Sequence, residues 1–329
     1  MIREAMHYIK EKDNTIACKL CPHNCNIKDG MRGICGAREL KNGLFQTLNY
    51  SEVSSIGIDP IEKKPLYHYR PGSQILSVGS FGCNFNCGFC QNYEISKNIP
   101  KTNEMSPNNL VNLAIKTKDN GNIGIAFTYN EPSVWYEYVF DTSKLCRESG
   151  MDVVLITNGY INNEPLKDII PYVNAMNIDL KAFNNEYYKN VCGGDIQSVL
   201  STIRLASSMC HVEITTLIVG GYNDKDEEIE KLSRWIASVN PDIPLHLSRY
   251  FPTYKFTAPQ TSEDIMIKCS RIAKKYLHYV YTGNMINFHN NTYCYNCGET
   301  LVERKEYRVK VILEIDKCPH CGANIYIIL

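Results

Sequence analysis

The segment Ser80-Phe-Gly-Cys-Asn-Phe-Asn-Cys-Gly-Phe-Cys-Gln-Asn92 places Cys83, Cys87 and Cys90 in the spacing C-x3-C-x2-C. Three thiolates this close on one loop can face a single centre, and thiolates favour iron–sulfur clusters or zinc. Because structural zinc takes four protein ligands, a zinc site here needs a distant fourth residue. Three ligands without an obvious fourth predict a [4Fe–4S] cluster in which one iron is open to an outside ligand.

Around this loop, from about residue 74 to about residue 285, short apolar runs alternate with longer amphipathic stretches. We expect helices to begin at Ser106, an N-cap before Pro107, and to span 133–149 and 226–239. Such alternation predicts a parallel sheet covered by helices. Six units favour an α/β fold with an open, partial (β/α)6 barrel of the TIM type, and a flat doubly wound sheet is the alternative. The expected strands are 74–80, 124–129, 152–157, 175–180, 212–219 and 245–250.

Composition divides the 329-residue chain into three sections. We expect a Cys-rich, metal-binding N-terminal extension at 1–73, the partial barrel at 74–288 and a compact Cys-rich tail at 289–329. At the end of the extension, the segment 59–73 contains several prolines, which favour turns and extended chain over a helix.

Cysteine is unusually frequent, with 15 residues, in a chain of otherwise ordinary globular composition (44% apolar, 21% charged). Lys plus Arg and Asp plus Glu both number 35, so no net charge attracts nucleic acid or an anionic membrane. No apolar run approaches the roughly 18 residues of a membrane span, and the N-terminus does not have the pattern of a secretory signal. We therefore expect a cytoplasmic protein whose clustered thiols are metal ligands or catalytic groups rather than disulfides.

Two further cysteine sets flank the predicted barrel. In the tail, Cys294, Cys297, Cys318 and Cys321 form two C-x2-C pairs, each followed by a Gly as in zinc knuckles. This spacing favours a structural zinc ribbon, and iron or an auxiliary cluster is the alternative. Because no basic run with interleaved aromatics accompanies it, we do not expect nucleic-acid binding.

The N-terminal set consists of Cys18, Cys21, Cys25 and Cys35. Four thiolates can close a tetrahedral zinc site, which would staple a segment too polar to fold alone. They can equally bind a second iron–sulfur cluster, which would provide an electron route. Both interpretations remain open at this point.

Several motifs occur in one order along nearly the whole chain. They are Cys18-Lys-Leu-Cys-Pro-His-Asn-Cys25, Arg32-Gly-Ile-Cys-Gly36, Asp59-Pro-Ile-Glu-Lys-Lys-Pro-Leu-Tyr67, Thr128-Tyr-Asn-Glu-Pro132, Thr157-Asn-Gly159, Asp179-Leu-Lys181 and the two Cys pairs of the tail. Together with the C-x3-C-x2-C loop, they resemble the radical S-adenosylmethionine (radical SAM) superfamily. The wider match is similar to the radical enzymes of the AmmeMemoRadiSam system, which are often labelled pyruvate formate-lyase-activating enzymes.

The resemblance implies that Cys83, Cys87 and Cys90 bind three irons of a [4Fe–4S] cluster and that S-adenosylmethionine binds the fourth. One-electron reduction would cleave S-adenosylmethionine to methionine and a 5′-deoxyadenosyl radical, which abstracts hydrogen from a substrate that the sequence does not identify. The protein would then be an oxidoreductase supplied with electrons by ferredoxin or flavodoxin. AMMECR-like and Memo-like proteins are implied partners, and the substrate is a small molecule or a protein.

The resemblance also implies roles for residues that follow the predicted strands. Glu131 stands where the superfamily has its amino-group motif, although Asn130 and Glu131 occur here in Tyr-Asn-Glu rather than the usual Gly-Gly-Glu. A carboxylate facing an ammonium forms a charge-assisted contact. Lys181 resembles the lysine that reaches the carboxylate or ribose of the ligand, and Asp179 is expected to bind the ribose or a cation.

Asn158 is expected to align the ribose, and Phe89 is expected to lie against the adenine. One departure concerns Phe251, since relatives usually carry a His at this position. Any role of that His with the ligand or in proton transfer has therefore moved or vanished. His246 and Arg249 are the nearby candidates for it.

Two alternative functions differ from this hypothesis in class. The first is an activase that places a radical on a glycine of a partner protein, as pyruvate formate-lyase-activating enzymes do. The second is a non-enzymatic zinc-ribbon scaffold or RNA-binding module that has lost its cluster. The intact C-x3-C-x2-C motif argues against the second alternative, which predicts three zinc sites and no binding of S-adenosylmethionine.

Overall fold

The computed structural model describes residues 3–285, 290–305 and 308–329, so the predicted boundary at 288 and 289 lies outside the described residues. Its centre is one sheet with the strand order β16-β15-β14-β13-β12-β11-β9-β8. Within this sheet, the strands from β16 to β9 are parallel to one another, and β8 is antiparallel to β9. The strands are β8 (Ser55–Pro60), β9 (Gln74–Gly79), β11 (Asn122–Phe127), β12 (Asp152–Thr157), β13 (Ala175–Asp179), β14 (His211–Ile218), β15 (Leu245–Arg249) and β16 (Val280–Gly283).

Helices follow most strands along the chain. They are α1 (Tyr93–Lys97), α2 (Pro107–Lys116), α3 (Tyr136–Glu148), α4 (Asn163–Ile169), α5 (Asn185–Tyr187), α6 (Ile196–Ser207), α7 (Asp226–Val239) and α8 (Glu263–Ala273). The predicted cap of α2 is present, since Ser106 Oγ accepts a hydrogen bond from the Asn109 N–H at 3.3 Å and Pro107 follows it. None of the described helices is both long enough and apolar enough to cross a membrane.

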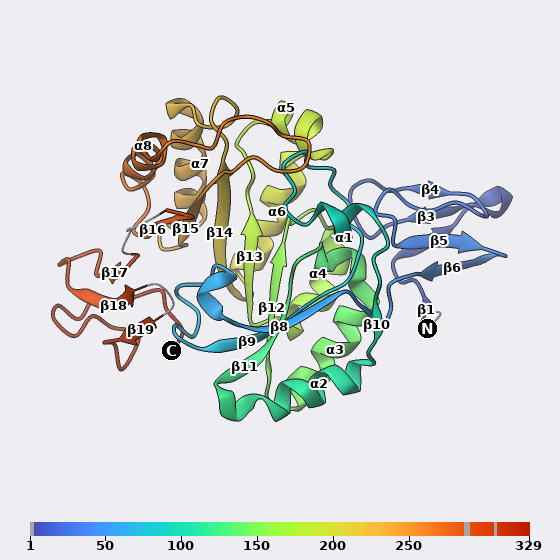
Figure 1. Ribbon diagram of the computed structural model, residues 1–329, viewed down its shortest axis with the longest axis horizontal. Coiled ribbons are helices and arrows are strands. Elements are labelled where there is room, and N and C mark those ends of the chain that lie inside the picture. Colours follow the sequence, from blue (N-terminus) through green and yellow to red (C-terminus); the bar gives the residue numbers. More distant parts are fainter. Residues whose placement is uncertain (1–2, 286–289, 306–307) are drawn as a thin grey trace.

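The order of the parallel strands does not reverse along the sheet. Right-handed crossovers therefore place the connecting helices on one face, whereas a doubly wound sheet requires a reversal of the strand order. Figure 1 shows the curved sheet with α2 and α3 beside β11 and with α7 and α8 beside β14 and β15. The sheet stays open, because β16 and β8 are its two edges. This topology confirms the partial α/β barrel and excludes the flat doubly wound alternative.

The N-terminal extension contains two small antiparallel sheets, β1-β6-β5 and β2-β3-β4, at one end of the molecule (Figure 1). The strands are β1 (Arg3–Glu4), β2 (Tyr8–Lys10), β3 (Ile16–Cys18), β4 (Asn26–Ile27), β5 (Arg38–Lys41) and β6 (Leu44–Thr47), and β7 (Glu52–Val53) pairs with β10 (Asn103–Glu104). Buried Arg38 forms an ion pair with buried Glu137 of α3. Side chains such as Ile16 and Leu20 share one apolar core with the barrel, so the extension is packed firmly against it.

The C-terminal tail lies at the opposite end of the molecule (Figure 1). It contains the antiparallel strands β17 (Thr292–Tyr293), β18 (Thr300–Lys305) and β19 (Arg308–Val311). Leu301 and Val302 of the tail share a small apolar core with Tyr279 and Tyr281 at β16. The last residues return to the barrel, where the Arg70 N–H donates to the Ile328 carbonyl at 2.7 Å.

Candidate active site

The three cysteines of the C-x3-C-x2-C loop open onto one cavity of about 300 Å³. The loop follows β9, and the other walls come from the carboxyl ends of β11 to β15, where ligand sites of parallel α/β barrels lie. Of the other predicted site residues, the cavity is lined by Phe89, Asn130, Glu131, Asn158, Asp179 and Lys181. A larger cavity, of about 470 Å³, lies between α8 and the tail and contains none of the predicted site residues.

Asn130 holds the start of the cysteine loop. Its Oδ1 accepts from the Ser80 N–H at 2.8 Å, and its Nδ2 donates to the carbonyls of Phe81 and Gly82 at 3.2 Å and 3.1 Å. These bonds occupy the side-chain amide, which is buried. The geometry therefore supports a positioning role for Asn130 beneath the cysteine loop.

Asn158 holds the same loop from β12. Its Nδ2 donates to Asn84 Oδ1 at 2.8 Å and lies 3.7 Å from Cys83 Sγ, while its Oδ1 accepts from the Tyr160 N–H at 2.8 Å. The Phe85 N–H also points at Cys83 Sγ, at 3.4 Å. Donors directed at sulfur stabilise thiolate ligands of iron–sulfur clusters and tune their potentials.

Glu131 connects the ends of β11 and β12. Its carboxylate accepts from the Ser133 N–H at 3.0 Å, from Thr157 Oγ1 at 2.6 Å and from the Asn158 N–H at 2.8 Å. Burial raises the pKa of Glu131, although these hydrogen bonds oppose that effect. Since both oxygens already accept hydrogen bonds, Glu131 fixes the two loops at the cavity wall, and an ammonium would have to share those oxygens.

Lys181 and Asp179 form an ion pair of 2.8 Å at the end of β13. Burial lowers the pKa of Lys181, but attraction to Asp179 and to Cys87 outweighs it and raises the pKa well above its usual range. Lys181 is therefore a cation at the cavity wall. Its Nζ lies 5.9 Å from the ring centre of Phe89.

Phe89 provides an apolar wall of the cavity. Its ring packs edge-on against Phe256, with ring centres 5.6 Å apart. The same Phe256 covers Gly88, where a Cβ atom would lie 2.7 Å from the aromatic ring. The Lys255 N–H donates to the Gly88 carbonyl at 2.9 Å. The segment after β15 is thus docked directly on the cysteine loop.

The two predicted residues of β15, His246 and Arg249, lie outside the cavity lining, and so does Phe251. His246 Nε2 lies 2.6 Å from Glu213 inside the barrel, and Arg249 Nε donates to the Thr261 carbonyl at 2.6 Å. Phe251 is exposed, and the Arg249 guanidinium lies over its ring. This placement does not support a role for His246 or Arg249 at the ligand. Ser248 lines the cavity instead. Successive residues of a strand point to opposite faces of the sheet, so Arg249 points away from the face on which Ser248 lies.

Cys192, which no motif of the sequence links to the site, also belongs to these surroundings. It lies beside the cysteine loop, where its carbonyl accepts from the Asn86 N–H at 2.6 Å. A hydrogen bond with the Cys192 thiol lowers the pKa of Cys87, although burial opposes this. The lowered pKa favours the thiolate, which is the form of cysteine that binds metals.

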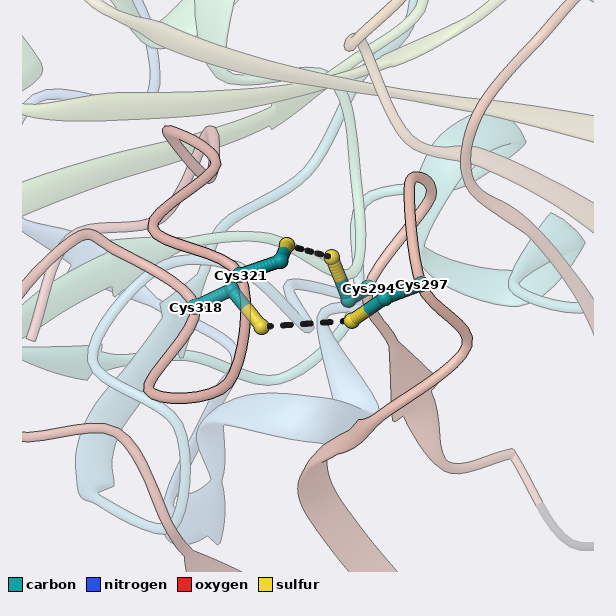
Figure 2. Close-up of side chains that lie close together, drawn as sticks. All are labelled: Cys294, Cys297, Cys318 and Cys321. Atoms are coloured by element: carbon teal, nitrogen blue, oxygen red, sulfur yellow. Dashed lines mark hydrogen bonds between the residues drawn. The ribbon is translucent and has the colours of Figure 1, made fainter.

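The four cysteines of the tail form a compact group. In the tail, the sulfurs of Cys294, Cys297, Cys318 and Cys321 all lie within 4.8 Å of one another. Figure 2 shows them in two facing pairs, Cys294 with Cys321 and Cys297 with Cys318, each 3.6 Å apart. This is a metal-binding group compatible with a zinc ribbon, since a zinc ion with bonds of about 2.3 Å to four sulfurs sets them about 3.8 Å apart.

Comparisons with known proteins agree with the geometry of the loop. The model of the radical SAM superfamily matches residues 77–236, which include the three cysteines, Glu131 and Lys181. An uncharacterised protein of Methanocaldococcus jannaschii is 43% identical over 339 residues that cover 100% of each chain. The pyruvate formate-lyase-activating enzyme of Clostridium pasteurianum is 25% identical over 178 residues, 51% of this chain and 72% of that enzyme.

Among solved structures, Streptococcus suis SuiB bound to S-adenosylmethionine has a TM-score of 0.51 and 14% identity, over 64% of this chain and 52% of that chain. This likeness concerns the fold alone.

The narrower resemblance to AmmeMemoRadiSam enzymes stays a prediction. The family match and the activating-enzyme relative indicate an enzyme that generates radicals, which sets aside the non-enzymatic scaffold. With its three-cysteine loop at the mouth of a partial barrel, this chain belongs to the radical SAM superfamily.

Proposed function

We propose that this radical SAM enzyme binds S-adenosylmethionine in the cavity of about 300 Å³ and cleaves it reductively to methionine and a 5′-deoxyadenosyl radical. The observation that carries the proposal is the convergence of Cys83, Cys87 and Cys90 with a cation, a carboxylate and an aromatic wall on that cavity. These groups match the carboxylate, the ribose and the adenine of the ligand in chemistry. The radical would abstract hydrogen from a substrate bound nearby.

The donor set fits a [4Fe–4S] cluster with one open iron. Cys83, Cys87 and Cys90 would hold the cluster, and hydrogen-bond donors from Asn158 and Phe85 already point at the Cys83 sulfur. When bound, such a cluster supplies the single electron for cleavage of S-adenosylmethionine and an iron for its amino and carboxylate groups. The chain positions the three thiols and shields them with buried side chains.

The other residues of the cavity orient the ligand. Lys181 would attract its carboxylate, Asp179 would accept from a ribose hydroxyl, and Phe89 would cover the adenine. Asn130, Glu131 and Asn158 act mainly through the loops that they hold, because the protein already uses their polar atoms. In this assignment, the direct contacts come chiefly from β13 and from the cysteine loop.

A second candidate function is the activation of a glycyl-radical enzyme. It is favoured by the 25% identity to a pyruvate formate-lyase-activating enzyme over 51% of this chain. In that case the substrate would be a glycine of a partner protein rather than a small molecule. AMMECR-like and Memo-like partners, and ferredoxin or flavodoxin as the electron donor, remain predictions from the sequence.

The test is anoxic reconstitution with iron and sulfide, reduction with dithionite and chromatographic measurement of 5′-deoxyadenosine formed from S-adenosylmethionine. We expect formation by the wild type and by Cys269→Ala, a matched control at a buried cysteine of α8, and loss of formation in Cys87→Ala. Equal yields from Cys87→Ala, or no nucleoside from wild type with a complete cluster spectrum, would overturn the proposal.

A further inference from the structure

The N-terminal thiols form one group at the base of the extension. Cys18 ends β3, and its N–H donates to the Cys25 carbonyl at 3.0 Å, while the Asn24 N–H closes a turn onto the Cys21 carbonyl at 3.0 Å. These hydrogen bonds hold Cys18, Cys21 and Cys25 on one turn after β3.

The spacing of these sulfurs differs from that of a single-ion site. A zinc ion bound to four thiolates sets their sulfurs about 3.8 Å apart. In a group of Cys, His, Asp or Glu residues that can hold one metal ion, the ligand atoms lie close together. Among the described residues, the tail cysteines form the one group of three or more whose ligand atoms all lie within 4.8 Å of one another. No three sulfurs of the N-terminal set, and not the three of Cys83, Cys87 and Cys90, all lie within that distance of one another. Because a cluster interposes several iron and sulfide atoms between its ligands, wide spacing suits a cluster and not a single ion.

The N-terminal group also has a buried cation beside it. Arg38 Nη1 lies 3.7 Å from Cys18 Sγ and 2.8 Å from the Met6 carbonyl, while Nη2 binds Glu137. Arg38 is only 1% exposed, so its charge acts in a medium with little screening. A guanidinium directed at sulfur stabilises thiolates, and hydrogen bonds to ligand sulfurs tune the potential of a cluster.

The N-terminal group and the cysteine loop are in direct contact. The Cys83 N–H donates to the Cys35 carbonyl at 3.3 Å, and a Cβ atom on Gly82 would lie 2.8 Å from the same carbonyl oxygen. His23 Nε2 lies 2.7 Å from the Asn84 carbonyl. A ligand residue of one group is thus linked to a ligand residue of the other by a single hydrogen bond.

We propose that Cys18, Cys21, Cys25 and Cys35 bind a second iron–sulfur cluster, which relays electrons to the cluster site of Cys83, Cys87 and Cys90. The second cluster would take one electron from a reduced low-potential electron-transfer protein and pass it to the oxidised cluster at the loop. No proton or group is transferred in this step. Only the relay rests on the proposed function, whereas the metal assignment stands without it.

The metal assignment is tested by counting metals in anoxically reconstituted full-length protein. The variant Cys83→Ala/Cys87→Ala/Cys90→Ala removes the loop ligands and leaves the N-terminal set intact. We expect it to retain iron and sulfide, an electron paramagnetic resonance signal after reduction, and one zinc per chain in the tail. Two zinc ions per chain, or no iron in this variant, would overturn the proposal.

The complementary variant is Cys18→Ala/Cys35→Ala, with Cys269→Ala as the matched control. It should lose the iron that the loop variant retains and keep a loop cluster whose resonance signal shifts when S-adenosylmethionine is added. Should this variant not fold, the loop variant still decides the metal assignment. If the wild type forms no 5′-deoxyadenosine while the metal counts hold, the proposed function fails and the second cluster stands.

The relay is tested by comparing two reductants. With reduced flavodoxin, we expect Cys18→Ala/Cys35→Ala to form 5′-deoxyadenosine at least tenfold more slowly than the wild type. With dithionite, a small molecule that can reach the loop cluster directly, the two proteins should differ less than threefold. Equal rates with flavodoxin would overturn the relay.

Discussion

Lys181 brings a positive charge to the cavity from the end of β13, between Asp179 and the ring of Phe89. Asn130 lines the same cavity, but its amide bonds the backbone of the cysteine loop. The two residues therefore act in different ways. Lys181 is available to a bound anion, whereas Asn130 determines the shape of the loop that holds the thiols.

For Lys181→Ala, we expect about a tenfold weaker affinity for S-adenosylmethionine, equivalent to about 1.4 kcal/mol, because one charge-assisted contact is lost. Equilibrium dialysis against the reconstituted enzyme measures this. The exposed Lys189→Ala serves as the control. An unchanged affinity in Lys181→Ala would show that the ligand carboxylate lies elsewhere.

For Asn130→Ala, we expect a free energy of unfolding lower by about 1–3 kcal/mol, because the buried Ser80 N–H and two carbonyls lose their partner. Iron retained at the loop should fall as well. Molecules that keep a full cluster should bind S-adenosylmethionine as tightly as the wild type. Denaturant titration and iron analysis test this against the exposed control Asn108→Ala, and a loss of affinity at full iron content would contradict it.

At the scale of elements, buried Glu213 of β14 connects three parts of the fold. Its carboxylate accepts from the N–H groups of Tyr67 and His68 at 2.9 Å and 2.7 Å, and it pairs with His246 of β15 at 2.6 Å and with His211 at 3.1 Å. The barrel interior below the cavity is thus organised by one carboxylate. This explains why His246 belongs to the core rather than to the ligand site.

For Glu213→Ala, we expect a loss of about 3–5 kcal/mol in the free energy of unfolding, because buried donors and two histidines lose a charged partner. Denaturant unfolding of metal-matched samples measures it. Removal of the exposed Glu148 of α3 should change the same quantity by less than about 0.5 kcal/mol. A similarly small effect at Glu213 would refute its organising role.

At the scale of the whole molecule, hydrogen bonds of the neutral His68 side chain link the tail to the barrel. His68 Nδ1 lies 2.6 Å from the Tyr326 carbonyl, and its Nε2 lies 2.6 Å from the Tyr281 hydroxyl. Burial lowers the pKa of His68 from 6.5 to about 3. The pKa of Glu213 is also lowered, because its hydrogen bonds and charge attraction to His211 and His246 outweigh the opposite effect of burial. Both groups resist protonation only in the folded state.

We therefore expect acid to destabilise the protein. Between pH 6.5 and about 3 the unfolded chain binds a proton at His68 that the folded chain excludes, so the free energy of unfolding falls as the pH falls. Glu213 adds to this loss at lower pH, where its unfolded form protonates. The Tm should fall less steeply between pH 7 and pH 5 for His68→Gln than for the wild type in the same metal state. An equal dependence of Tm on pH in the two proteins would contradict the assignment.

The amino-acid pattern predicts the parts of the molecule that depend on near neighbours along the chain. The apolar runs that became β9, β11, β12, β13, β14 and β15, the Ser106 cap and the three-cysteine loop are all encoded within a few residues. The edge strands β8 and β16 escaped prediction. β8 alternates between half-buried and exposed positions and β16 has four residues, so neither resembles the long buried runs of the centre.

Local pattern predicted that Cys83, Cys87, Cys90, Asp179 and Lys181 lie together at the strand ends, because each lies at or just after a strand that the sequence already reveals. All five line one cavity. The fold alone decided that Ser248 faces the cavity and Arg249 does not, since sheet packing selects which face of β15 is inside. It likewise brought Cys192 to Cys87 and placed Cys35 against Cys83. Such contacts join residues far apart in the chain, and only packing of the whole barrel sets their distances.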